Sequence, residues 1–178
     1  CGYAVPEKVI TNQDLEKIVE TSDEWISTRT GIKKRHVVAP GQAASDLACI
    51  AARKAMENAG ISEQEIDLII VGTVTGDTIF PSTACWIQKK LGIEDCLSYD
   101  VSAACSGFLF SLINADLMLR TGMKKTALVI GVDILSNLLN WEDRTTCILF
   151  GDGCGAAILQ VSDKGPDCLI ASDWGTNV

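Results

Sequence analysis

The sequence predicts an α/β domain with a mixed, largely parallel sheet and helices on both faces. Strand-like and helix-like segments alternate along the chain, which is typical of this fold class. The runs 67–74 and 126–132 are continuously apolar, as in strands that are buried on both faces. The 178 residues are 47% hydrophobic and 21% charged, which favours one domain over residues 1–178 with a sizeable core.

Helices are predicted where capping residues meet a helical spacing of apolar residues. The predicted helices are 11–19, 22–28, 43–59, 82–91 and 106–120. The third and fourth end at Gly60 and Gly92, which suit the left-handed position after a helix, and Pro81 opens the fourth. The fifth is apolar almost all round, so we expect a buried central helix surrounded by protein.

Strands are predicted from short apolar or β-branched runs between turn residues. They are 34–39, 67–74, 96–101, 126–132, 145–150, 154–161 and 168–172. The turn Gly151-Asp-Gly153 joins the fifth and sixth, and 162–166 reads as another turn. A strand-like run follows the G-x-G-x-G segment, so it lacks the helix that a dinucleotide-binding loop requires.

Composition argues against several classes of function. A net charge of −8 disfavours nucleic-acid binding, which needs clustered basic residues. No apolar run approaches the ~20 residues of a membrane span and no signal peptide is evident, so we expect a cytoplasmic protein without membrane contact. The eight cysteines form no CxxC pair and His36 is the only histidine, so neither a disulfide framework nor a metal site is expected.

Cys105 is the candidate nucleophile, because it lies where a predicted strand turns into the apolar helix. The first N–H groups and the positive dipole end of a helix favour the thiolate and can stabilise an oxyanion. Gly107 would leave room for a substrate to approach the backbone. From the residues alone, a small buried core cysteine is the competing interpretation, and we adopt it for the other seven.

The segment Asp100-Val-Ser-Ala-Ala-Cys-Ser-Gly-Phe108 resembles the active-site motif of β-ketoacyl-acyl-carrier-protein synthase III, a condensing enzyme of the thiolase superfamily. Segments 21–32, 80–85 and 150–156 resemble further parts of that family, in the same order and at similar spacing. The resemblance implies a thiolase-like fold of which this chain is the N-terminal half. It also implies an acyltransferase that starts fatty acid synthesis, condensing a short acyl-CoA with malonyl-acyl-carrier protein through a thioester on Cys105.

The resemblance assigns four residues to coenzyme A. Trp25 matches a tryptophan stacked on the adenine, and Arg144 an arginine on the other face of that base. Arg29 matches an arginine that contacts the phosphates, and Thr21 a threonine beside the nucleotide. Without the family, Trp25 would be read as core packing and the two arginines as solvated charges.

Phe80 matches an aromatic residue that crosses a dimer interface and limits the acyl pocket, so the resemblance implies a homodimer that takes short primers. Acyl-CoA is a substrate, and no separate cofactor or metal is implied. The family's catalytic histidine and asparagine belong to a second half, so we expect the complete Cys-His-Asn site to need residues beyond this chain.

Three alternatives stay open. The chain could belong to a 3-hydroxy-3-methylglutaryl-CoA synthase-like enzyme or to a polyketide-priming enzyme, although the pair Trp25 and Arg144 favours the synthase III group. It could also be a non-catalytic acyl-binding or dimerisation fragment.

Overall fold

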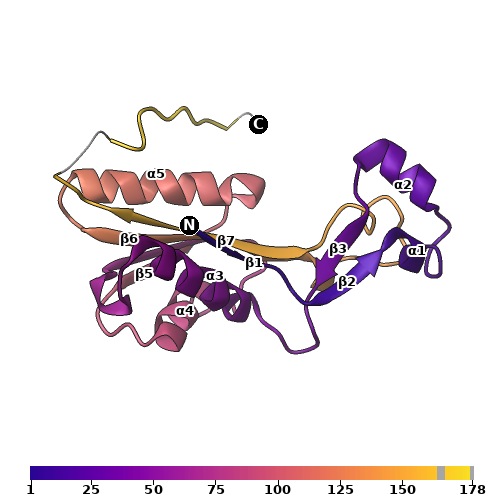
Figure 1. Ribbon diagram of the computed structural model, residues 1–178, viewed down its shortest axis with the longest axis horizontal. Coiled ribbons are helices and arrows are strands. Elements are labelled where there is room, and N and C mark those ends of the chain that lie inside the picture. Colours follow the sequence, from indigo (N-terminus) through magenta and orange to yellow (C-terminus); the bar gives the residue numbers. More distant parts are fainter. Residues whose placement is uncertain (164–166, 177–178) are drawn as a thin grey trace.

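The computed structural model describes residues 1–163 and 167–176, and a five-stranded sheet runs through its centre (Figure 1). The strand order is β1-β7-β6-β4-β5. The strands are β1 (Gly2–Ala4), β4 (Leu68–Gly72), β5 (Leu97–Val101), β6 (Thr126–Ile134) and β7 (Asp152–Gln160). β4 pairs in parallel with β5 and β6, while β7 is antiparallel to β6 and β1. The sheet is mixed, with its parallel part on the β5 side.

Helices cover both faces of the sheet, as predicted (Figure 1). α3 (Ala44–Ala59) and α4 (Thr83–Leu91) bury their apolar sides with β4, β6 and β7 in one core. α5 (Gly107–Arg120) packs on the opposite face and closes a second core with β4 and β6. The ends of α3 and α4 are confirmed within one residue, because Gly60 and Gly92 adopt the left-handed backbone that ends each helix.

α5 differs from the expectation that protein would surround it. Leu109 and Leu117 are 57% and 49% exposed on its outer side. Among the described residues, the sheet covers its inner side. The extended segment 167–176 touches α5 where Phe110 meets Trp174 edge-on at 5.7 Å, and at Arg120, which donates to Asp167 and to the carbonyl of Leu169 at 2.9 Å each. A helix that is apolar all round needs protein on every side, and here only one side is fully covered.

A small lobe, which we define as residues 8–37 and 141–149, extends from one end of the sheet (Figure 1). It contains β2 (Lys8–Thr11) paired antiparallel with β3 (Lys34–Val37), together with α1 (Asn12–Leu15) and α2 (Asp23–Thr30). Its core is separate from those of the sheet. The buried residues of this core are Leu15, Ile26, Cys147 and Ile148. The lobe is therefore held by few apolar side chains.

Four predictions of local structure were wrong or incomplete. Residues 145–150 form consecutive turns instead of a strand, because Cys147 and Ile148 bury in the core of the small lobe while Thr145 and Thr146 bond to Asp143. Residues 168–172 form no strand with any part of the chain that the structure describes. α1 ends at residue 15 instead of 19, and neither β1 nor β2 was predicted.

Three short 3-10 helices were not predicted either, at Glu63–Glu65, Ala104–Ser106 and Leu135–Asn137. Part of the predicted turn at 162–166 lies outside the described residues. No helix within the described ranges has the length and apolar character that a membrane crossing requires.

Candidate active site

Cys105 lies in the 3-10 turn Ala104–Ser106 that connects β5 to α5, and its side chain is exposed. It borders an open cavity of about 270 Å³. The other lining residues are Gly72, Ala104, Phe108, Gly131, Val132, Asp133, Gly151 and Gly153. Gly72 and Gly131 are register partners at the carboxyl end of β4 and in β6. The cavity thus opens at the carboxyl edge of the parallel strands, where ligands of open α/β sheets commonly bind.

Glycines let the start of α5 rest directly on the sheet. A Cβ atom at Gly72 would lie 2.4 Å from the carbonyl carbon of Gly107, and one at Gly107 would lie 3.2 Å from the Cα of Gly72. The expectation that Gly107 leaves room for a substrate is therefore wrong, because the backbone of β4 fills that space. These two glycines fix the height of Cys105 above the sheet.

Ala104, directly before Cys105, has a φ of +44°. A residue with a Cβ atom rarely adopts this left-handed backbone, which costs of order 1–3 kcal/mol and occurs often at functional sites. No other non-glycine residue has a positive φ in the part of the chain that the structure describes. The turn that presents the thiol is therefore strained.

The carboxylates of Asp133 and Asp100 accept hydrogen bonds that position the segments around the cavity. Oδ1 of Asp133 accepts hydrogen bonds from the hydroxyls of Thr73 (3.2 Å) and Thr75 (2.8 Å), and from the backbone N–H of Val74 (2.9 Å). Asp100, at the start of the Cys105 motif, accepts from the N–H groups of Thr83 (2.7 Å) and Ala84, in the first turn of α4. The motif aspartate thus ties β5 to α4.

Most other cysteines are in different environments from Cys105. Burial raises the pKa of the Cys154 thiol to about 12, with a smaller contribution from Cys49, and burial also raises the pKa of Cys49, Cys96 and Cys147. These four side chains therefore remain thiols at neutral pH. Cys1, Cys85 and Cys168 are not among the residues that line the cavity.

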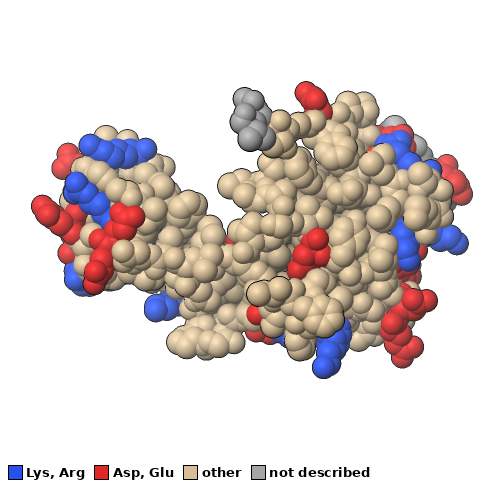
Figure 2. Space-filling view, turned by 180° about the vertical axis from the view of Figure 1, so that it is seen from behind, with Lys and Arg blue, Asp and Glu red and all other residues tan. Residues whose placement is uncertain are grey.

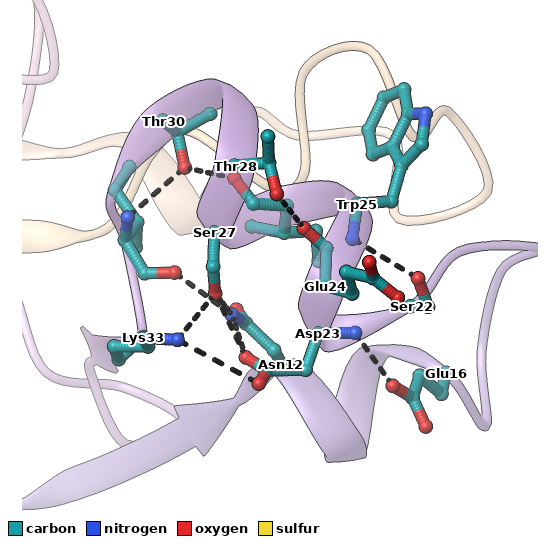
Figure 3. A network of polar contacts seen from close by, with 12 residues as sticks. Asn12, Glu16, Ser22, Asp23, Glu24, Trp25, Ser27, Thr28, Thr30 and Lys33 are labelled. Carbon is teal, nitrogen blue, oxygen red and sulfur yellow. Dashed lines mark hydrogen bonds and ion pairs between the residues drawn. The ribbon is translucent and has the colours of Figure 1, made fainter.

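Trp25, Arg29 and Arg144 come together in the small lobe. The guanidinium carbons of Arg29 and Arg144 lie 4.3 and 4.8 Å from the centroid of the Trp25 ring. Trp25 is half-buried, and its backbone N–H donates to the hydroxyl of Ser22 at 3.1 Å at the start of α2 (Figure 3). Among the described residues, neither arginine has a carboxylate partner. An indole beside two unpaired guanidinium groups can hold an anionic aromatic ligand.

Thr21 lies beside this group. Arg144 donates from Nη1 to the carbonyl of Glu20, the neighbour of Thr21, at 3.1 Å. The hydroxyl of Thr21 is buried and has no hydrogen-bond partner among the residues that the structure describes. Figure 2 shows that charged side chains of both signs gather on the small lobe, while the surface between the lobe and the sheet is mostly uncharged.

Phe80 lies apart from both groups, on the loop between β4 and α4. Phe80 is 89% exposed, and Ile79 beside it is fully exposed. The base of the loop is fixed, because the carboxylate of Asp77 accepts from the N–H (2.8 Å) and the hydroxyl of Ser45. Thr78 accepts a bond from the indole N–H of Trp86 at 3.0 Å. The loop therefore presents two apolar side chains from an anchored base.

Sequence reasoning missed several polar residues that arrange these groups. Asp152 is 5% exposed and accepts from the N–H of Val38 (2.7 Å) and from the N–H and hydroxyl of Ser136 (2.9 and 2.6 Å). A carboxylate between two glycines in an apolar run was the available signal. Asn12 and Arg35 have no comparable sequence context that would mark them as buried. His36 is not in the cavity lining, and its Nδ1 lies 2.6 Å from the carbonyl of Pro6.

The predicted site residues therefore fall into three places: Cys105 in its cavity, Thr21 with Trp25, Arg29 and Arg144 in the small lobe, and Phe80 on an exposed loop. Within the described ranges, no group of three or more His, Cys, Asp or Glu side chains is arranged to hold a metal ion.

Comparisons with known proteins agree with this architecture. Residues 99–178 match the family 3-oxoacyl-[acyl-carrier-protein (ACP)] synthase III. The chain is 57% identical over 163 residues to the β-ketoacyl-[acyl-carrier-protein] synthase III of Thioalkalivibrio sulfidiphilus, and the match covers 92% of this chain and 51% of that protein. The corresponding enzyme of Xanthomonas oryzae pv. oryzae is 56% identical with nearly the same coverage. The chain thus spans about half the length of the curated relatives it matches.

Solved structures give the same result. The 3-oxoacyl-[acyl-carrier-protein] synthase III of Aquifex aeolicus superposes with a TM-score of 0.89 at 48% identity, over 92% of this chain and 53% of that one. The priming β-ketosynthase of the R1128 polyketide pathway superposes at 0.88 with 33% identity, over 92% and 49%. With its mixed thiolase-like sheet, the chain therefore resembles the N-terminal half of a β-ketoacyl-[acyl-carrier-protein] synthase III in sequence and in fold.

Proposed function

We propose that the protein is a β-ketoacyl-acyl-carrier-protein synthase III, an acyltransferase that condenses a short acyl-CoA with malonyl-acyl-carrier protein and so starts fatty acid synthesis. The observation that carries this proposal is the position of Cys105. It is exposed in an open cavity at the start of α5, on a strained turn, in a chain whose relatives bear that enzyme name.

In the first half-reaction, the Cys105 thiolate attacks the carbonyl carbon of acyl-CoA. The tetrahedral intermediate collapses with loss of the CoA thiolate, which leaves the acyl group on Sγ of Cys105 as a thioester. Donors at the start of α5 are suited to stabilise the oxyanion. Strain at Ala104 supports this role, because strained backbone persists where the surrounding structure imposes it.

In the second half-reaction, malonyl-acyl-carrier protein loses carbon dioxide and the resulting carbanion attacks the thioester carbonyl. The carbon–carbon bond forms as the bond to Sγ breaks, which releases 3-oxoacyl-acyl-carrier protein and restores the thiolate. Among the described residues, Asp133 is the only ionisable side chain besides Cys105 in the cavity lining. The histidine and asparagine that the family uses for decarboxylation are therefore expected from the remainder of such an enzyme.

Trp25, Arg144, Arg29 and Thr21 form the proposed nucleotide subsite for CoA. Trp25 offers a half-buried ring for the adenine, and the two unpaired guanidinium groups offer charge for the base and the phosphates. The buried, unpaired hydroxyl of Thr21 supports a polar contact that the free protein does not make.

Phe80 supports the further proposals of a homodimer and of short primers. A fully exposed pair of apolar side chains on an anchored loop is typical of a contact surface. In this arrangement Phe80 of one subunit would border the acyl pocket of the other. We also propose that the protein is located in the cytoplasm.

Acylation of Cys105 tests the proposal directly. Purified protein incubated with acetyl-CoA should gain one acetyl group, located at Cys105 by peptide mass spectrometry. Cys105→Ala should abolish the gain, while Cys168→Ala, which removes another exposed thiol, should leave it unchanged. Acetylation of a different cysteine with Cys105 unmodified would overturn the assignment.

A second enzyme of the same superfamily remains a candidate, because the R1128 priming β-ketosynthase is 33% identical and superposes with a TM-score of 0.88, against 0.89 for the synthase III of Aquifex aeolicus. Acyl preference separates the two, since faster acylation by acyl-CoA longer than acetyl-CoA would favour polyketide priming. The same assay addresses the non-catalytic alternative, since no acylation by any acyl-CoA would favour a fragment without chemistry.

A further inference from the structure

The two sides of the Trp25 group come from distant parts of the sequence. Trp25 and Arg29 lie on α2, whereas Arg144 lies on the turn 144–149 that follows β6. Arg144 touches the α2 side through an exposed hydrogen bond from Nη1 to the carbonyl of Glu20, and through its guanidinium over the Trp25 ring at 4.8 Å. Two exposed contacts of this kind contribute little to geometry, so other residues must set the spacing.

Asn12 fixes both ends of α2. Its Nδ2 donates to Oδ1 of Asp23 at 2.7 Å, at the first residue of the helix, and to the carbonyl of Ile32 at 2.8 Å, just beyond its end (Figure 3). Asn12 is fully buried. Its side chain therefore determines where α2, and with it the Trp25 ring, lies against α1.

Arg35 continues the chain of hydrogen bonds to the other side. Its Nη2 donates to Oδ1 of Asn12 at 2.9 Å and to the carbonyl of Ile148 at 3.0 Å, on the turn that carries Arg144. Its Nη1 donates to the carbonyl of Ile10 at 3.3 Å. The continuous path α2–Asn12–Arg35–Ile148 thus connects the helix that carries Trp25 to the turn that carries Arg144.

Arg35 is an unusual residue to find there. It is 4% exposed, it forms no ion pair with a described carboxylate, and its Nε has no hydrogen-bond partner. Burial lowers its pKa, which reflects the cost of removing a charge from water. An apolar side chain of similar size would avoid that cost. We therefore attribute to the guanidinium a role other than stabilising the fold.

We propose that Arg35 and Asn12 are positioning residues for nucleotide binding, which hold Trp25 on α2 and Arg144 on the turn 144–149 at the separation that receives the adenine. This inference rests on the proposed function, because it assumes that the Trp25 group binds the nucleotide of CoA. Neither residue touches the ligand, and both act through the segments that they connect.

The test compares acetyl-CoA with acetyl-pantetheine, a donor that lacks the nucleotide, in the acylation of Cys105. Arg35→Met should raise KM for acetyl-CoA by about tenfold. This is the weakening of binding expected when one or two hydrogen bonds are lost. KM for acetyl-pantetheine and the limiting rate with both donors should not change. Met56→Ala, a core substitution beneath the sheet, is the matched control, because it lowers the melting temperature without selecting between the donors.

A double-mutant cycle separates positioning from simple stabilisation of the lobe. Trp25→Ala alone should raise KM for acetyl-CoA by about tenfold or more, the typical contribution of an aromatic ring stacked on a base. In the background of Trp25→Ala, Arg35→Met should add little, because the ring that it positions is gone. Asn12→Ala should behave in the same way.

The outcomes distinguish the inference from the function on which it rests. If Trp25→Ala affects both donors equally, the proposed nucleotide subsite is wrong. If Trp25→Ala selects between the donors but Arg35→Met does not, or if the two effects add fully, the inference alone is wrong. If Arg35→Met does not fold, Arg35→Lys decides, since one ammonium group keeps the charge but cannot reproduce the forked contacts and should give the same selective rise in KM.

Discussion

The sheet and the small lobe hold their candidate site residues by different means. Around Cys105, backbone packs on backbone at Gly72 and Gly107, and two large apolar cores lie to either side. In the small lobe, four buried apolar residues form the core, and the polar side chains of Asn12 and Arg35 connect the segments. Cys105 is thus placed by packing, whereas the Trp25 group is placed by hydrogen bonds. The two regions should respond differently to substitution and to pH.

The largest effect is expected for Gly72→Ala. The added Cβ atom would overlap backbone atoms of α5, which cannot move without lifting the helix from the sheet. We expect a loss of at least about 4 kcal/mol in the free energy of unfolding, in the range of severe core overpacking. Urea unfolding measures it. Gly155→Ala is the matched control, because no atom lies within 4 Å of its added Cβ, and an equal loss in both variants would contradict the packing argument.

An intermediate effect, confined to one region, is expected for Ile26→Ala. Ile26 is fully buried in the core of the small lobe, and its truncation should cost about 3 kcal/mol. Native-state hydrogen exchange should show lost protection in α2 and β3, while the amides of β4 and β6 keep theirs. The milder Ile26→Val should cost about 1 kcal/mol with the same distribution. Equal losses in both regions would mean that the lobe does not open independently.

The smallest effect is expected on the stability of the small lobe at acid pH. Hydrogen bonds from Asn12 and then from Ser27 hold the pKa of Asp23 below its ordinary value of 3.8. The stability that this carboxylate contributes is complete above that ordinary value and is lost as the pH falls below it, because the unfolded chain then binds the proton more readily. The small lobe should weaken below about pH 4 before the sheet does.

Asp23→Asn should reduce this pH dependence, and Asp95→Asn, which removes an exposed carboxylate outside the small lobe, is the control for the change in net charge. Urea unfolding followed by the indole NMR signals of Trp25 and Trp141 from about pH 2 to about pH 6 measures the effect. Identical acid profiles in the two variants would remove Asp23 from the explanation.

Much of the fold could be predicted because its signals are local. The ends of α3 and α4 follow from Gly60 and Gly92, and the strands β4 and β6 from long apolar runs. The strand prediction for 145–150 was wrong because two buried apolar residues in a turn have the same pattern as a short strand. Periodicity shows that such residues are buried but not which element carries them.

The site was predictable only in part, for a related reason. Cys105 and Trp25 belong to recognisable segments, but the residues that arrange them do not stand out. Arg35 would be taken for a solvated charge and Asn12 for a helix cap, since their burial depends on contacts between segments far apart in the sequence. The left-handed backbone of Ala104 was equally invisible, because alanine carries no preference for it.

That residue also constrains how the site can vary. Valine, isoleucine or threonine at position 104 would bring a branched Cβ into a backbone that tolerates branching least, whereas glycine would remove the strain and free the turn to rotate. Variation at position 104 therefore has a narrow range beside Cys105: a residue small enough to accept the twist, yet not so permissive that the sulfur loses its fixed direction.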